Sequence, residues 1–207
     1  MAIISNGTTI ADAGSFASGL VNADQVLIKT LTASSSANLT FVHGASSVVL
    51  DSTYPVYRFV CTNIHPATND TFFTVNFRDG STAYDATKTS THFRAYQTEG
   101  GSDPVLGYYN GGDLAQGTGV QRIAGFGIPD DNDASCSGEL FLFNPSSTTF
   151  VKHYISDFNS MATGPYTLRN KVSGYCNVTA AIDGVQFTMS SGNIDAGVIK
   201  LYGIKDS

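Results

Sequence analysis

The stretch SSGNIDAGVIKLYGI, residues 190–204, gives the clearest indication of how this chain folds. A polar turn opens it, and in the apolar part that follows, Lys200 and Tyr202 alternate with Ile199 and Leu201. Successive side chains of a β-strand point to opposite faces, so this period of two predicts a strand that ends in a layered β protein. The same pattern recurs along the chain, which favours an all-β fold.

Short segments rich in β-branched and aromatic residues, separated by turn residues, run through the body of the chain. We expect strands near residues 25–32, 38–42, 47–50, 57–62, 72–77, 91–96, 121–126, 139–143, 149–155, 174–179, 185–189 and 198–204. The segment 121–126 is expected to pair at a sheet edge, and residues 98–120 and 157–170 are expected to be loops.

Helical periodicity is missing from the sequence. No segment keeps an i, i+3, i+4, i+7 apolar stripe for three turns, so parallel βαβ units have no crossover helices and are excluded. Roughly ten to twelve strands with turn signals between them predict an antiparallel β-sandwich of jelly-roll type.

The chain of 207 residues is expected to form one domain preceded by an arm. Residues 1–24 are too polar for a core segment and too apolar for a free tail. They predict an assembly or anchoring arm that packs on the domain or on a neighbouring subunit, with a frayed terminus as the alternative. Residues 25–207 predict a single β-sandwich, because such folds commonly reach about 200–250 residues as one unit.

Charge and hydropathy exclude several classes of protein. The net charge is −6 and the 11 Lys and Arg residues are scattered singly, which disfavours nucleic-acid binding. No apolar run is long enough for a membrane-spanning helix, and no secretory signal is expected, so synthesis in a cytoplasm is predicted. Only 14% of the residues are charged. A surface of Ser, Thr, Asn and Gly suits stable contact with proteins or sugars.

Catalytic patterns are nearly absent, and no catalytic residue, metal or cofactor is predicted. The four histidines form neither an HxH nor an HExxH pair, and there is no GxSxG motif or phosphate-binding loop. Cys61, Cys136 and Cys176 lack CxxC spacing and are expected to be buried thiols. Glu99 and Glu139 are the only glutamates, so paired acids for glycoside cleavage have few candidates.

An acidic run stands out as a weak candidate for a calcium site. Asp130, Asp131 and Asp133 lie together, and Ca²⁺ prefers such oxygen ligands. The run lacks the spacing, the glycine and the later Glu of an EF-hand loop. A hydrated turn is therefore the favoured interpretation.

The glycine-rich segment holds the best candidate contact surface. Tyr108, Tyr109 and Asp113 lie there among Asn and Gly, and a rigid tyrosine ring costs little entropy to order in a binding surface. These residues would stack on and hydrogen-bond to a sugar. The alternative is a loop that its own tyrosines pin to the domain.

Four segments together resemble a family of structural proteins encoded by tailed bacteriophages of aquatic, especially marine, bacteria. They are residues 62–68, 88–91, 138–149 and 190–204, and the resemblance covers most of residues 25–204. It implies a virion component with an all-β fold and self-association, and it implies no catalytic residue.

The leading hypothesis is a non-enzymatic virion protein on the particle surface, either a capsid decoration (cement) protein or a short fibre or knob. Its expected partners are further copies of itself, in a cyclic homo-oligomer such as a trimer, and major capsid or tail proteins. The alternative is a carbohydrate-binding adhesin that recognises a host surface glycan. A glycan-degrading enzyme is a third, weaker hypothesis.

Overall fold

The protein is built of β-strands joined by turns and loops. The computed structural model describes residues 2–5, 8–12, 15–16, 24–102 and 104–206, and within these ranges it holds no helix, hence none that would span a membrane. The strands are β1 (Ile3–Ser5), β2 (Thr8–Asp12), β3 (Ser15–Phe16), β4 (Gln25–Thr32), β5 (Leu39–Val42), β6 (Val56–Pro66), β7 (Thr71–Arg78), β8 (Lys88–Thr98), β9 (Val105–Tyr108), β10 (Gln121–Ile128), β11 (Cys136–Phe143), β12 (Lys152–Ala162), β13 (Tyr166–Cys176), β14 (Gly184–Met189) and β15 (Ile194–Ile204).

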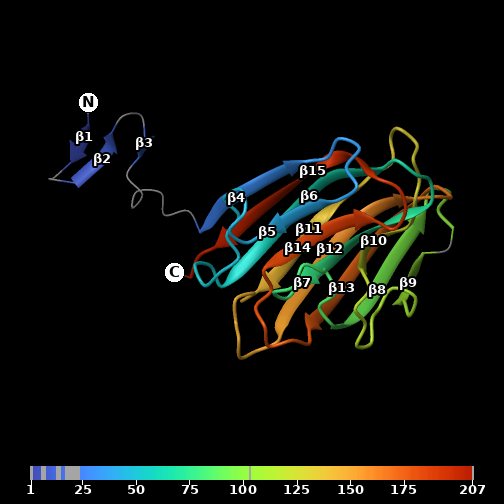
Figure 1. The fold of residues 1–207 in the computed structure, drawn as a ribbon. Helices are drawn as coiled ribbons and strands as arrows, with labels where there is room; N and C mark the ends of the chain where they lie inside the picture. The colour runs from blue at the N-terminus through green and yellow to red at the C-terminus, as the bar shows by residue number, and fades with distance from the viewer. Residues whose placement is uncertain (1, 6–7, 13–14, 17–23, 103, 207) are drawn as a thin grey trace.

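Two antiparallel sheets pack face to face (Figure 1). The larger has the order β4-β15-β6-β11-β12-β13-β8-β9, and the smaller has the order β10-β7-β14-β5. The chain pairs from its ends inwards, because β4 pairs with β15, β5 with β14, β6 with β11 and β7 with β10. Such nested pairing across two sheets is the jelly-roll arrangement. The predicted antiparallel sandwich is therefore confirmed.

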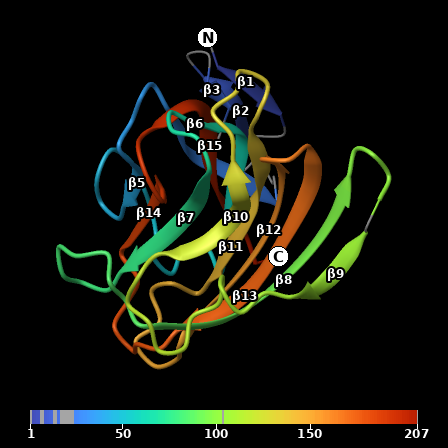
Figure 2. The same ribbon diagram turned by 90° about the vertical axis from the view of Figure 1, so that its right-hand side faces the viewer.

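Two inserted hairpins lengthen one sheet only. The hairpin β8–β9 lies between β7 and β10 in sequence, and β12–β13 lies between β11 and β14. Strand β12 pairs with β11, and β8 pairs in turn with β13. We call β12, β13, β8 and β9 the extension. The smaller sheet has only four strands, and its edge strand β10 packs on β12 and β13. Figure 2 shows β8 and β9 projecting to the right, beyond the smaller sheet.

An aromatic cluster fills the space between the sheets. The ring of Phe187 in β14 lies 5.5–6.3 Å, centroid to centroid, from the rings of Phe41, Phe59 and Phe73. All four side chains are fully buried, and they come from β5, β6, β7 and β14. Burying a phenylalanine side chain stabilises a fold by about 1.5–3 kcal/mol, so these rings hold the two layers together.

The three cysteines confirm the prediction of buried thiols. Cys61, Cys136 and Cys176 are free and buried. Burial raises the pKa of each thiol, and that of Cys176 reaches about 12. They act as small apolar core residues.

The prediction of a loop over residues 157–170 is wrong. There β12 and β13 pair along their whole length, from Lys152 opposite Cys176 to Ala162 opposite Tyr166, and only a short turn joins them. The inward positions of β12 in this segment include Ser160 and Ala162, whose small or polar side chains conceal the alternation in the sequence.

Two other segment predictions also need correction. Residues 47–50 form no strand, although Val48 and Leu50 are buried, because a short apolar run can pack into a core as a turn. The segment 98–120 is not all loop, since it contains β9, which pairs with β8. The segment 121–126 lies in β10, which is an edge strand as expected.

The described part of the arm, residues 1–24, forms a small sheet of its own. Its strands β1, β2 and β3 are antiparallel neighbours and belong to neither sheet of the sandwich (Figure 1). Ile3 and Ile4 are 57% and 60% exposed. Packing of the arm against another subunit stays a prediction.

Candidate binding faces of the extended sheet

The extension presents one face to the smaller sheet and the other to solvent. Strand alternation decides which residue lies on which face. In β13, for example, Leu168 and Val172 are buried, whereas Arg169 and Lys171 are exposed. We call the solvent side of the extension the outer face and the opposite side the inner face.

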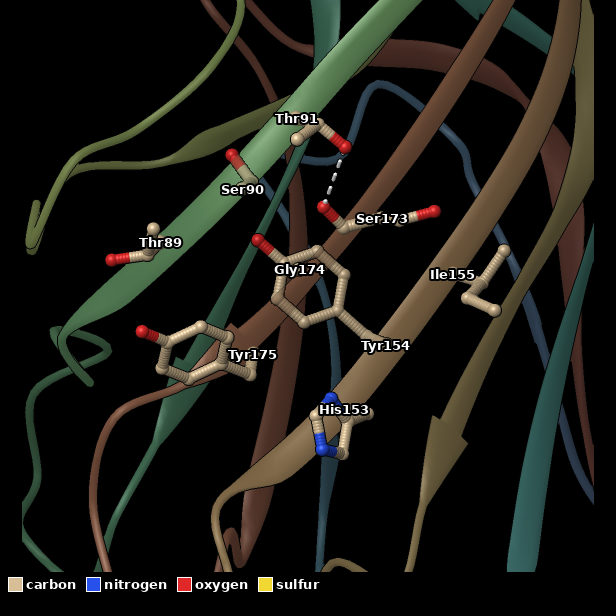
Figure 3. A pocket seen from close by; sticks show the side chains of 9 residues that line it. All are labelled: Thr89, Ser90, Thr91, His153, Tyr154, Ile155, Ser173, Gly174 and Tyr175. Atoms are coloured by element: carbon tan, nitrogen blue, oxygen red, sulfur yellow. Dashed lines mark hydrogen bonds between the residues drawn. The ribbon is translucent and has the colours of Figure 1, made fainter.

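A shallow hollow of about 430 Å³ lies on the outer face across β12, β13 and β8 (Figure 3). Its floor is the backbone of three residues that lie opposite one another on neighbouring strands: Tyr154, Gly174 and Ser90. The side chains of Tyr154 and Ser90 point to the inner face. The outward side chains of the two adjoining rows wall it: His153, Tyr175 and Thr89 on one side, and Ile155, Ser173 and Thr91 on the other. The lining is mostly apolar with hydroxyl groups, and no carboxylate of a described residue belongs to it.

A second hollow of about 400 Å³ lies further along the same face, where Leu106, Asn159 and Arg169 are among its lining residues. At this second hollow, Arg169 donates a hydrogen bond from Nε to the Asp157 carboxylate at 2.8 Å. This arginine lowers the pKa of Asp157. The outer face thus combines exposed apolar groups, hydroxyls and a local ion pair.

The structure divides the predicted contact residues between the two faces. Tyr108 is 46% exposed on the outer face, its ring meets Phe93 edge-on, and its hydroxyl donates to the Asp113 carboxylate at 2.6 Å. That hydrogen bond raises the pKa of Tyr108. Tyr109, the next residue, points inwards and packs edge-on against His92 and Phe126. A binding role for Tyr108 and Asp113 stays a prediction, whereas Tyr109 pins its loop to the domain.

A buried hydrogen-bond network fixes the rest of that loop. Gln121 accepts hydrogen bonds from Ser90 Oγ at 2.6 Å and from the Tyr154 hydroxyl at 3.1 Å. Its amide nitrogen donates to the Gly112 carbonyl at 2.7 Å, and the Leu114 amide donates to Ser90 Oγ. The loop over the inner face is therefore held by buried and partly buried polar contacts.

The inner face contains a small cavity of about 220 Å³. The sequence did not predict this cavity. Arg94 and Tyr96 of β8, Tyr166 of β13 and Phe126 of β10 are among its lining residues. These residues are far apart in the chain. Their only sequence signal is an arginine at an inward position of an alternating strand.

The acidic run lies in the exposed turn between β10 and β11. The backbone of Asp131 accepts a hydrogen bond from the Ala134 amide at 2.8 Å, which closes the turn. Asp133 lines an open polar hollow together with His65 and Asp195, whereas Asp130 does not. Within residues 2–5, 8–12, 15–16, 24–102 and 104–206, no three His, Cys, Asp or Glu side chains converge as a metal site would require.

Known proteins supply no relative whose role would transfer to this chain. No protein-family model matches it, and neither does a curated protein or a solved structure. Its function is therefore inferred from the two faces of the extension and from the arm.

Proposed function

We propose that the chain is a non-enzymatic structural protein displayed on the surface of a bacteriophage virion, as a capsid decoration (cement) protein or a short fibre or knob. The resemblance of its strand segments to virion proteins of tailed phages suggests this role. Jelly rolls recur in viral capsid and lectin domains. Because one fold serves many functions, the fold agrees with the role without deciding it.

The observation that carries the proposal is the small N-terminal sheet. Its strands have only two to five residues, and it exposes Ile3 and Ile4. A sheet with strands this short gains little stability in water unless its hydrophobic face is covered. A neighbouring subunit or capsid protein that covers the isoleucines would stabilise it. A cyclic homo-oligomer, such as a trimer, would bring that partner surface to every arm.

The outer face offers a second contact surface of the same kind. Leu106 is 81% exposed, and Phe93, Tyr108 and Ile155 are also exposed there. Scattered apolar groups among hydroxyls suit contacts of modest strength. Repetition of such contacts over many copies raises the overall avidity without any new interaction.

The test is the location of the protein on the particle. Virions of the phage that encodes the chain would be labelled with a gold-conjugated antibody against it and imaged by electron microscopy. We expect dense, regular label on the outside of intact particles. Label that appears only after the particles are opened would contradict surface display.

A carbohydrate-binding adhesin is the second candidate, and the hydroxyl-rich hollow with Tyr175 and His153 favours it. Sugar sites commonly combine aromatic and polar groups in such concave places. On an array of host polysaccharides, we expect Tyr175→Ala to abolish binding, while Tyr84→Ala, on the smaller sheet's side, leaves it unchanged. If the unmodified protein binds no polysaccharide on the array, the adhesin hypothesis is refuted and the decoration role is favoured.

A further inference from the structure

Two of the five arginines differ from the others in their partners. Three form ion pairs with carboxylates: Arg58 with Glu139, Arg78 with Asp183, and Arg169 with Asp157. Arg94 and Arg122 have no carboxylate partner among the residues that the structure describes. Both lie against the ring of Tyr109 at the inner face.

Arg94 is held in place by stacking rather than by ion pairing. Its guanidinium carbon lies 4.3 Å from the ring centroid of Tyr109 and 4.5 Å from that of Phe126. The structure records no hydrogen bond from its N–H groups to a described residue. A guanidinium clamped between two rings keeps a planar fork of donors pre-organised for a carboxylate.

Arg122 is engaged with the protein itself. Its guanidinium lies over the ring of Phe72, and Nη1 donates to the Tyr109 hydroxyl at 2.9 Å. The hollow that it lines also contains Asp113, whose negative charge would repel an anion. Arg94 is therefore the better candidate for an anionic ligand.

The cavity beside Arg94 has the chemistry of a sugar site. Tyr96 and Tyr166 line it, with ring centroids 5.3 Å apart, and Phe126 supplies a further ring. Neither tyrosine hydroxyl has a recorded hydrogen bond to a described residue, so both are available to a ligand. The volume of about 220 Å³ lies below the range of about 300–1,000 Å³ for drug-sized ligands, which suits a single sugar ring.

Charge selects among sugars. The protein carries a net charge of −6, yet among the described residues no carboxylate lines this cavity, and Arg94 is the one charged group there. A neutral sugar would leave the donor fork unmatched, whereas a carboxylate would accept two parallel hydrogen bonds from it.

We propose that this cavity binds a hexuronic acid residue of an acidic polysaccharide. The sugar carboxylate pairs with the Arg94 guanidinium, an apolar ring face packs on the aromatic rings, and ring hydroxyls bond to Tyr96 and Tyr166. The inference goes beyond surface display, since binding requires only the isolated chain. Its failure would leave the particle-labelling result untouched.

The test is a titration followed by NMR of the backbone amides and the arginine side-chain N–H groups. The probes are methyl glucuronoside, the neutral methyl glucoside and acetate. We expect the uronoside to shift the Arg94 Nε–H resonance with a dissociation constant of about 1 mM, the scale of a small ligand. The glucoside and acetate should bind at least about tenfold more weakly, since each offers only part of the site.

Variants connect the binding to the proposed contacts. Arg94→Lys keeps the charge but loses the fork, so we expect about tenfold weaker binding of the uronoside. Arg169→Lys, on the outer face, is the matched control and should bind as the unmodified protein does. If Arg94→Lys does not fold, the double variant Tyr96→Phe, Tyr166→Phe tests the same cavity by removing only two hydroxyls.

Three results would overturn the proposal. If the uronoside causes no shifts, the cavity does not bind this sugar. Equal affinity for the glucoside would refute the role of the carboxylate. Equal affinity for acetate would make it a simple anion site without sugar recognition.

Discussion

Single positions in this fold are sensitive because the backbones of neighbouring strands approach closely. Gly138 in β11 lies between β6 and β12, and a Cβ there would come within 2.3 Å of the Asp157 carbonyl oxygen. We expect Gly138→Ala to lower the free energy of unfolding by about 1–3 kcal/mol through overpacking. Gly100→Ala is the control, because a Cβ there meets no atom within 4 Å. Equal midpoints of urea unfolding for the two variants would contradict this packing.

Lys88 is a fully buried lysine without an ion pair to any described residue. Its Nζ donates to Asn76 Oδ1 and to the Ala86 carbonyl, both at 2.6 Å. Burial lowers its pKa to about 8. The Thr118 carbonyl oxygen lies 3.4 Å from Nζ and accepts a third hydrogen bond. Three amide and carbonyl oxygens thus take the place of a carboxylate.

This lysine makes stability depend on pH in a defined direction. Between its folded pKa of about 8 and an unfolded value of about 10.4, the unfolded chain binds more protons, so the free energy of unfolding rises with pH. Between these two pH values, we expect the free energy of unfolding of the unmodified protein to rise by up to about 3 kcal/mol more than that of Lys88→Met. Urea unfolding at pH 7 and pH 10 measures it, with Cys176→Ala present in both proteins, because burial raises and the Lys88 charge lowers the pKa of that thiol. Parallel changes in the two proteins would refute the lowered pKa.

At the scale of elements, the extension depends on the loop that closes its inner face. Gln121 of β10 joins Ser90 of β8, Tyr154 of β12 and the loop carbonyl of Gly112. No other described side chain connects these three segments through one amide group. Side-chain hydrogen bonds therefore fix this loop, although it has no regular structure.

Removal of that amide should loosen the loop before it unfolds the sandwich. Gln121→Ala leaves buried partners unsatisfied, which costs about 1–3 kcal/mol for each such group. We expect faster hydrogen exchange at the amides of residues 109–114, with little change in β5, β14 and β15. Thr118→Ala, at an exposed position of the same loop whose side chain has no recorded hydrogen bond to a described residue, is the control. Uniform acceleration over the whole protein would show that the network supports the entire fold instead.

At the scale of the whole molecule, the sandwich and the arm are expected to be separable. The core residues all lie within residues 33–201, and the small sheet of β1–β3 contributes no strand to either layer. The proposed surface role assigns assembly to the arm and stability to the sandwich. These two contributions can be measured independently.

A chain of residues 25–207 should keep the thermal midpoint of the full chain and lose its self-association. Native mass spectrometry of both chains measures the oligomer, and circular dichroism measures the midpoint. The double variant Ile3→Ser, Ile4→Ser should have the effect of the truncation, because it removes the exposed apolar groups. If the oligomer persists after both changes, the arm does not form the interface, and the outer face becomes the candidate for it.

How much of this was predictable differs between parts of the chain. Strands with strict alternation, such as the segment around Tyr57 and Phe59, were predicted at nearly the right place, because their burial repeats every second residue. The tip of the long hairpin β12–β13, residues 157–170, was missed, since serine, asparagine and alanine fill inward positions there. The placement of Arg94 beside Phe126 was beyond prediction, because it depends on how distant strands pack.

The sequence by itself determined that this chain is a β-sandwich with buried thiols, because a period of two and side-chain hydrophobicity are local properties. Only the tertiary structure decided that two hairpins extend one sheet and that Tyr108 and Tyr109 serve opposite faces. It alone brought to an aromatic cavity an arginine that has no carboxylate partner in the described part of the chain. The physical reason is that pairing register and cavity walls arise from contacts between segments far apart in the chain, which no local pattern encodes.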